Sequence, residues 1–305
     1  MSMTVTIEQG VTAPFIGGYK RLTSPGFTGT PKLLDLLFGP STPGVSQILL
    51  PRTGLVFICC TADAHDEMGR PAYSTNCHQI ELDNYVQLQH YPKILIEQLL
   101  EDQRKGLTLK TPAPFTIQAS NPQPFTKTDH DLLHGLFTDT QLLNLILALL
   151  VNSQRFYVST TIKVPKPTEP LNIIYALLKL VPQPYRVFSW STCRNGVFSP
   201  EQPHSLICFR DAMLHVRYDN AGGSYPPSLQ FLARHLLKDS AVAQKMFMSL
   251  YESLPPKLAM YYAPIEFMAD TSKDQDLMQW LIRQYLDAKQ YSRVSKYAAL
   301  LESLH

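Results

Sequence analysis

Apolar and polar residues alternate along the first third of the chain with the period of β-strands. The segment 4–9 alternates at every second position, and 46–60 contains two apolar runs separated by a Pro-Arg pair. Alternation of period two is typical of half-buried strands, and two runs around a short break predict a hairpin. A further strand is predicted at 76–82, after a polar and turn-rich stretch at 62–75 that we interpret as a surface loop.

The middle of the chain mixes strand and helix patterns. Strands are predicted at 155–162 and 185–192, with an apolar helix between them at 171–180. A strand, a helix and a second strand in succession predict a parallel crossover. Two further short strands within 205–217 predict a hairpin.

From about residue 227 onward the pattern is helical. Apolar residues recur every three or four positions in the last two segments, 276–288 and 292–304. This spacing gives each helix one apolar face, so we expect the two helices to pack as an antiparallel pair. On the second helix we expect Tyr291 and Val294 to lie on the packed face.

These patterns predict an α+β fold, in which mixed sheet-containing N-terminal and central parts precede an all-helical C-terminal part. We divide the chain into a β-rich part at 1–125, an α/β part at 126–220 and a helical part at 221–305. The Pro-rich segment 111–125 has no helical period, and we interpret it as the linker between the first two parts.

The charge balance bears on the choice of partner. The chain carries 27 basic and 25 acidic residues, so its net charge of +2 provides no strong field toward nucleic acid. Charged residues make up only 17% of the chain, which indicates either a larger interior or more surface that a protein partner covers. We therefore expect a protein partner and no nucleic acid. A nucleic-acid-associated subunit is kept as a second alternative, and it would use the basic residues of the last helices, Arg283, Lys289, Arg293 and Lys296.

The cysteines favour a reducing compartment. There are five, an odd number, and two of them are adjacent, which is not typical of a disulfide framework. The first residues lack the basic and apolar regions of a signal peptide, and the apolar block 142–151 is shorter than the roughly 20 residues of a bilayer helix. We expect a cytoplasmic protein that does not enter the membrane.

Two groups of residues have the chemistry of metal ligands. His130 and His134 are four positions apart, which places both imidazoles on one helical face, but no third ligand follows at a motif spacing. Cys77 and His78 are adjacent on a predicted strand and point to opposite faces, as do the cysteines at 59 and 60. We expect no bound metal and no cofactor.

The chain does not contain the motifs of common catalytic and nucleotide-binding sites. The segment Ser-Trp-Ser-Thr-Cys at 189–193 differs from the nucleophile elbow Gly-x-Ser-x-Gly, and neither glycine-rich phosphate-binding motif is present. We therefore assign no catalytic residue. A hydrolase that uses Cys77 with His78, or the pair His130 and His134, is kept as the first alternative.

Three segments carry a set of motifs that belong together. The segment 18–26 has a Gly-Tyr element and a Ser-Pro-Gly turn, and Gly69-Arg70 is followed by Cys-His-Gln-Ile-Glu-Leu at 77–82. The segment 180–192 combines a helix-end proline, an arginine and an aromatic-serine strand. In order and rough spacing these segments resemble the N-terminal domain of the bacterial GTPase-associated proteins, a family linked to conflict (defence) systems.

The resemblance implies a non-enzymatic adaptor or regulatory subunit that acts with a GTPase or another protein of such a system. It covers about residues 4–217, and it departs from the family pattern at Val181 and at Trp190. Aromatic residues and arginine concentrate binding energy at interfaces. The binding residues that we predict on this basis are Arg70, His78, Arg186, Phe188 and Trp190.

Overall fold

The computed structural model consists of two compact units, Met1–Gly223 and Ser224–His305, which we call unit 1 and unit 2. Each unit is described by itself. The described residues are 4–15, 18–29, 43–50, 53–87, 96–97, 101, 113–118, 123–151, 158–163, 170–186, 189–192, 206–210, 213–218 and 225–304. The division of the chain at residues 125 and 220 stays a prediction, although strands from the first two predicted parts join one sheet.

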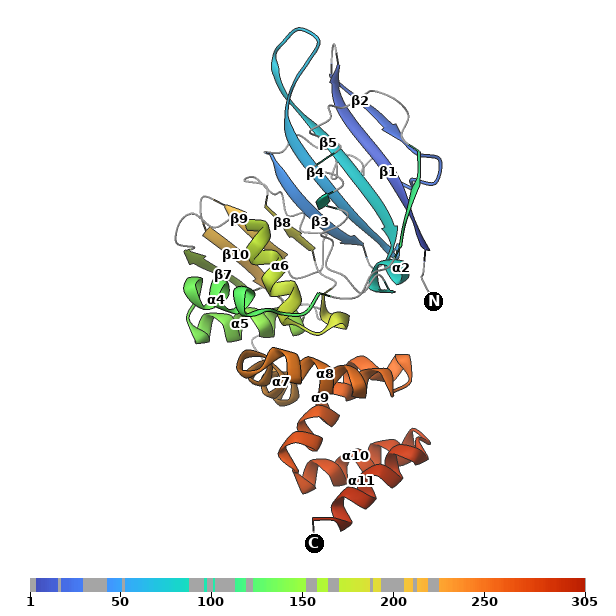
Figure 1. The fold of residues 1–305 in the computed structure, drawn as a ribbon. Coiled ribbons are helices and arrows are strands. Elements are labelled where there is room, and N and C mark those ends of the chain that lie inside the picture. Colours follow the sequence, from blue (N-terminus) through green and yellow to red (C-terminus); the bar gives the residue numbers. More distant parts are fainter. Residues whose placement is uncertain are drawn as a thin grey trace. The chain divides into compact units, whose positions relative to one another are not determined.

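The strands of unit 1 form a sheet in the order β2-β1-β5-β4-β3-β8-β9-β10-β7, with β6 paired to β1 (Figure 1). Their bounds are β1 Thr4–Phe15, β2 Gly18–Thr23, β3 Gly44–Leu50, β4 Leu55–His65, β5 Pro71–Glu81, β6 Phe115–Gln118, β7 Val158–Lys163, β8 Ser189–Ser191, β9 Leu206–Arg210 and β10 Met213–Tyr218. The sheet is mixed because β8 and β9 are parallel, whereas β4 and β5 are antiparallel. Unit 2 is helical, so the predicted α+β fold with an all-helical C-terminal part is confirmed.

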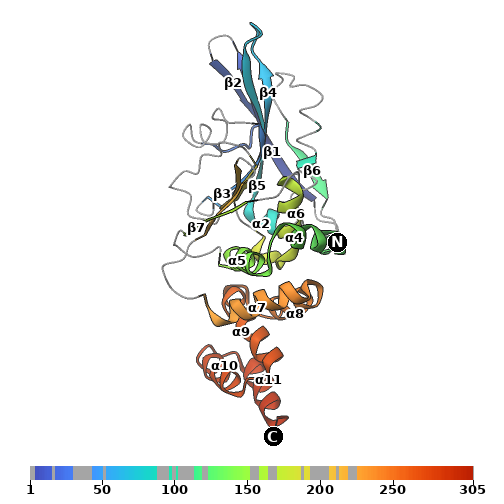
Figure 2. The same ribbon diagram turned by 90° about the vertical axis from the view of Figure 1, so that its left-hand side faces the viewer.

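Two segments that we interpreted as loop or linker form strands instead. The stretch 62–75 is the outer part of a long hairpin, in which β4 continues to His65 and β5 begins at Pro71. The prediction of a surface loop was wrong because this hairpin extends beyond the buried core, where polar residues can occupy strand positions. The predicted linker contains β6, which pairs with the first residues of β1 (Figure 2).

The predicted parallel crossover is present in unit 1. Strand β7 is antiparallel to β10, β10 is antiparallel to β9, and β9 is parallel to β8, so β7 and β8 run in the same direction. Helix α6 (Pro170–Leu180) lies between β7 and β8 in the chain. Helix α4 (Lys127–Leu136) contacts α6, and α5 (Asp139–Leu150) contacts β10, so these helices cover that part of the sheet.

The helices α4 and α5 begin at capping boxes. The Thr126 and Thr138 side chains accept the backbone N–H groups of Asp129 and Gln141, whose side chains in turn accept the N–H groups of the two threonines. Within the part of the chain that the structure describes, no single helix has both the length and the apolar composition of a membrane span; α4 and α5 meet both only as a pair bent by 112°.

Both faces of the central strands are buried, and the strand register fixes which residues share a face. Gln47 lies opposite Ile58, and Ile58 opposite His78, so these side chains point to one face. Helix α2 (Leu82–Gln87) places Tyr85 over this face, which we call the Tyr85 face. The opposite face, which we call the Phe27 face, includes a buried cluster with two aromatic side chains and two thiols, Phe27, Phe57, Cys59 and Cys77.

Two polar side chains of the sheet hold the chain segment that covers the Phe27 face. Glu8 and Gln79 lie opposite one another on β1 and β5. The Glu8 carboxylate accepts the Ser24 hydroxyl and the Gly26 N–H, while Gln79 accepts the Thr28 N–H and donates to the Gly26 carbonyl at 3.2 Å. This clamp places the Phe27 ring 5.7 Å from the Phe57 ring, centroid to centroid.

Unit 2 consists of short helices that follow one another closely. They are α7 Pro227–Lys238, α8 Ser240–Glu252, α9 Pro256–Ser272, α10 Gln275–Asp287 and α11 Tyr291–Glu302. Helices α10 and α11 pack against each other as predicted, and the Tyr285 and Tyr297 rings are nearly parallel. The predicted packed face of α11 was wrong at Tyr291, which is exposed, because Tyr297 takes the buried position.

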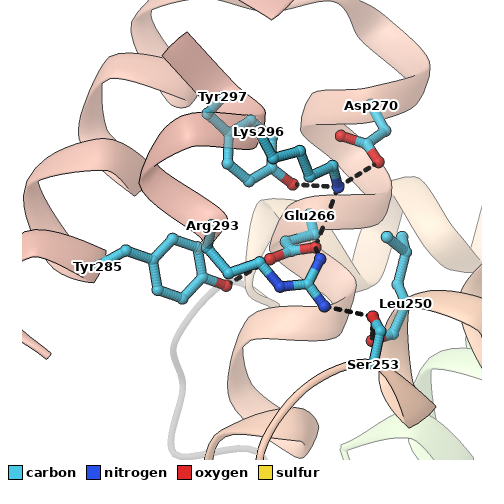
Figure 3. A network of polar contacts seen from close by, with 8 residues as sticks. All are labelled: Leu250, Ser253, Glu266, Asp270, Tyr285, Arg293, Lys296 and Tyr297. Atoms are coloured by element: carbon cyan, nitrogen blue, oxygen red, sulfur yellow. Dashed lines mark hydrogen bonds and ion pairs between the residues drawn. The ribbon is translucent and has the colours of Figure 1, made fainter. Parts of the chain in front are cut away.

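A fully buried carboxylate joins the last three helices (Figure 3). Glu266 of α9 accepts the Tyr285 hydroxyl at 2.6 Å and lies 3.0 Å from an Arg293 nitrogen and 3.3 Å from Lys296 Nζ. Lys296 also pairs with Asp270 at 2.8 Å. Two of the four basic residues that defined the nucleic-acid alternative therefore serve an internal network. Because burial and the Glu266 hydrogen bond raise the pKa of the Tyr285 hydroxyl, it stays protonated and able to donate.

We predict that Gly26→Ala destabilises unit 1 by about 1–3 kcal/mol, the usual range for a forced contact in a packed site. A Cβ at this position would lie 2.5 Å from a Glu8 oxygen, and Glu8 could move away only by giving up its bonds to Ser24 and Gly26. Urea unfolding monitored by circular dichroism measures the change. Gly135→Ala is the matched control, because nothing lies within 4 Å of its Cβ and alanine favours the helix; equal effects of the two changes would contradict the clamp.

We predict that Glu266→Ala destabilises unit 2 by about 3 kcal/mol, because it leaves the cations of Arg293 and Lys296 beside an apolar site. Hydrogen exchange measured by mass spectrometry should become faster over 225–304. The control is Glu252→Ala, which removes an exposed carboxylate from α8. Unchanged exchange in α9 and α11 of the Glu266 variant would show that the network does not hold these helices.

Candidate functional site

The predicted binding residues fall into an exposed group and a buried group. Arg70 lies in the turn between β4 and β5, and 63% of its side chain is exposed. His78, Arg186 and Trp190 are buried in unit 1. Phe188 lies outside the described residues. Their role in binding stays a prediction, and the structure gives three of them a position that no partner can reach from the surface.

The turn that carries Arg70 is held by one carboxylate. Asp66 accepts the backbone N–H groups of Met68 and Arg70, both at 2.9 Å, and pairs with the Arg70 guanidinium at 2.6 Å. The Arg70 N–H, followed by its side chain and the Met68 N–H, lowers the pKa of the Asp66 carboxyl. Gly69 has φ 73°, a left-handed conformation that favours glycine. The Gly-Arg motif therefore shapes a tight and exposed turn.

His78 and Trp190 belong to one row of side chains across the Tyr85 face. Trp190 lies opposite Gln47, Gln47 opposite Ile58, and Ile58 opposite His78. Neighbouring strands lie about 4.8 Å apart, so His78 and Trp190 are separated by roughly 14 Å. They share a face but cannot act on the same atom.

His78 is a neutral imidazole in an apolar site. It is 1% exposed, its ring lies edge-on to the Phe115 ring at 4.9 Å, and neither ring nitrogen has a hydrogen-bond partner. Burial lowers the pKa of His78 to about 3. The residue therefore packs β6 against the sheet and stays uncharged at physiological pH.

Arg186 belongs to a polar group that lies around Gln47. Its Nε donates to the Val181 carbonyl at 2.9 Å, which satisfies a backbone group just after the end of α6. Burial lowers the pKa of Arg186 to about 10, and the electrostatic interaction with Tyr85 opposes this shift. The Tyr85 hydroxyl donates to Gln47 at 2.8 Å, and burial raises its pKa. These contacts connect the segment after α6 to the centre of the sheet.

The strand that follows Arg186 is fixed to β3 by Thr192. The Thr192 N–H donates to the Val45 carbonyl at 2.8 Å, and the Val45 N–H donates to the Thr192 hydroxyl at 2.9 Å. Trp190 itself is fully buried, and its Nε1 has no hydrogen-bond partner. The aromatic-serine-threonine segment is thus a packed strand at the centre of the sheet.

The residues of the hydrolase alternative are only partly brought together. The His130 and His134 rings lie 4.1 Å apart on α4, and their Nδ1 atoms face Asp131 and Asp139 at 3.4 and 3.3 Å. Among the described residues, no group of three or more His, Cys, Asp or Glu side chains is placed to hold a metal ion.

The Cys77 and His78 side chains point to opposite faces of β5, as the sequence predicted. The Cys77 thiol faces Cys59, and its contact with His78 is to the backbone carbonyl, at 3.9 Å. The imidazole of His78 is therefore not placed to take a proton from the Cys77 thiol.

Exposed apolar side chains lie at the end of the sheet that carries the Arg70 turn, and most of them were not predicted from the sequence. Strand β1 is antiparallel to β5, so the last residue of β1 lies at the end of the sheet where β5 begins (Figure 1). Three large apolar side chains are exposed there, Phe15 at 43%, Tyr19 at 41% and Met68 at 67%. We call these three residues and Arg70 the hairpin end. The sequence signal for the hairpin end was the polar turn between β4 and β5. It becomes visible only when β4 is extended beyond residue 61 and β5 begins before residue 74.

Comparisons with known proteins do not assign the chain. No family model matches it, no curated protein matches it significantly, and no solved structure matches it significantly. The geometry described above is therefore the basis for a functional proposal, together with the resemblance of its motifs.

We predict that acid destabilises unit 1 through His78. The unfolded imidazole binds a proton below its ordinary pKa of 6.5, and the folded one only near pH 3, so stability falls as the pH drops from 6.5 toward 3. The total loss is on the order of a few kcal/mol. Free energies of unfolding measured between pH 7 and about 4 should fall less steeply for His78→Leu. His130→Gln, a change at an exposed position, is the control, and equal slopes for His78→Leu and wild type would contradict this role.

Proposed function

We propose that the chain is a non-enzymatic adaptor that binds a protein partner through the hairpin end of unit 1. The observation that carries the proposal is the exposure of Phe15, Tyr19 and Met68 at one end of the sheet. Aromatic residues and methionine are enriched at protein interfaces.

The positions of the motif residues support the same proposal. The Ser-Pro-Gly turn, Gln79, Arg186 and Thr192 make contacts inside unit 1 that hold the sheet together. Arg70 differs because its guanidinium is exposed next to Met68. The buried motif residues then act as supports, and the exposed arginine belongs to the binding surface.

The partner that we propose is a GTPase of a bacterial conflict system, as the resemblance of the motifs implies. The near-neutral net charge of +2 supports a protein partner, because it provides little attraction for nucleic acid. The odd cysteine count supports a cytoplasmic location.

The test is direct binding of purified proteins. The GTPases and effectors encoded next to the gene are titrated with the full chain by isothermal calorimetry, each GTPase with GDP and with a non-hydrolysable GTP analogue. We expect one of them to bind, and we expect the double variant Tyr19→Ala/Met68→Ala to weaken binding at least about tenfold, since truncated anchor residues commonly cost over 1 kcal/mol each.

The matched control is Tyr261→Ala, which removes a tyrosine that is 62% exposed in unit 2. It should leave the affinity unchanged. The circular dichroism spectra of all variants should match the wild type, because each substitution is at an exposed position. If no neighbouring protein binds, the adaptor proposal fails; if one binds and the double variant binds equally well, the interface lies elsewhere.

A further inference from the structure

Two thiols face each other across the central strands of unit 1. Cys59 of β4 and Cys77 of β5 are directly opposite in the register and lie on the Phe27 face. Both are buried, at 4% and 0% exposure, and neither forms a disulfide in the structure.

The backbone hydrogen bonds show which kind of antiparallel pair they form. At one end of the β4–β5 pairing, the Asp66 N–H donates to the Arg70 carbonyl at 3.0 Å. At the other end, the Leu82 N–H donates to the Gly54 carbonyl at 2.7 Å. Hydrogen-bonded pairs alternate with non-hydrogen-bonded pairs along the strands. Counting in steps of two from Gly54 or from Asp66 places the hydrogen-bonded pairs at the even-numbered residues of β4. Cys59 has an odd number, so Cys59 and Cys77 are a non-hydrogen-bonded pair.

Non-hydrogen-bonded pairs bring opposite side chains closest together. Their Cα atoms lie about 4.5 Å apart, which is within the roughly 4.4–6.8 Å range of disulfides. The next pair of the same kind, Thr61 and Thr75, confirms the close approach, because their hydroxyl oxygens are 3.0 Å apart. A bond between Cys59 and Cys77 therefore needs no change of register.

We propose that Cys59 and Cys77 are a redox-active pair that a hydroperoxide converts to a cross-strand disulfide. In the first step one cysteine sulfur attacks a peroxide oxygen, the O–O bond breaks, and water or an alcohol leaves, which produces a sulfenic acid. In the second step the other sulfur attacks the sulfenic sulfur and water leaves. The two thiols are oxidised by two electrons in total, and the peroxide is reduced.

The covering segment controls access to the pair. Phe27 packs over the thiols, and its position depends on the Glu8 and Gln79 clamp. Burial, together with the neighbouring Cys77, raises the pKa of the Cys59 thiol, so this thiol stays protonated while Phe27 is in place. Opening of the 24–28 turn would expose both sulfurs at once.

The test treats the folded wild-type chain with hydrogen peroxide, removes the peroxide with catalase and alkylates the remaining thiols after denaturation. Peptide mapping by mass spectrometry under non-reducing conditions should find the Cys59 and Cys77 peptides linked within one chain. Before alkylation, the intact mass of the oxidised chain should be lower by two hydrogens. Dithiothreitol should restore both thiols. If both cysteines are found alkylated after the peroxide treatment, they were not oxidised, and the proposal is overturned. It is also overturned if Cys59 and Cys77 are each oxidised without a link between them.

Cys60→Ser is the matched control, because Cys60 is adjacent in sequence but lies opposite Asn76 on the other face. This variant should form the linked peptide to the same extent as the wild type, whereas Cys59→Ser and Cys77→Ser should not. A link that includes Cys60 would contradict the register argument. The wild-type map does not depend on the variants, so the proposal stays testable if a serine at position 59 or 77 prevents folding.

Discussion

The antiparallel register between β4 and β5 is the constraint on which the rest of unit 1 depends. It sets His78 and Ile58 on one face, and Cys59 and Cys77 on the other. A shift by one residue would move every side chain of a strand to the opposite face. Because both faces are buried, such a shift would exchange a packed imidazole for a thiol, and the sheet would lose the contacts that cover it.

Polar side chains inside this sheet are tolerated where they bind the backbone of covering segments. Glu8 and Gln79 bind the backbone of the 24–28 turn, and Arg186 binds the carbonyl after α6. A buried donor or acceptor without a partner costs about 1–3 kcal/mol, so each of these contacts removes a penalty and fixes a segment at the same time. The polar residues of the motifs therefore attach covering segments to the sheet. The apolar side chains of the hairpin end are exposed instead, which is why we prefer this end of unit 1 as the candidate for recognition.

The sequence predicted the elements whose side chains alternate between two environments. Period two located the start of β1, the hairpin of β3 and β4, and the inner part of β5, and the three- and four-residue spacing located α10 and α11. It failed for the outer hairpin at 62–75, because strand residues beyond the core need not be apolar. It also failed for β6, since a Pro-rich segment can still pair along four residues at an edge.

The candidate site was predicted only at Arg70, and the reasons are physical. Motif matching selects residues that a fold requires, and here most of those requirements concern packing, as at Trp190 and His78. Exposed apolar residues such as Tyr19 become visible only when pairing shows that β2 begins where β1 ends, at the end of the sheet that carries the β4–β5 turn. The same limit applied to the basic residues of α11, because the sequence does not reveal that Glu266 lies beside Arg293.

Unit 1 combines rigidity and exposure within one pair of strands. Cys59 and Cys77 lie in its buried centre, and the same two strands continue outward to the turn that carries Met68 and Arg70. The strands are continuous, so a covalent bond between the two thiols would reduce the freedom of the strands to separate, and its effect would extend toward the turn. A recognition surface on a hairpin depends on how well its strands stay paired, because a preorganised surface loses less entropy on binding. The binding that we propose at the hairpin end would therefore depend on the central register, although no residue of the centre would touch the partner.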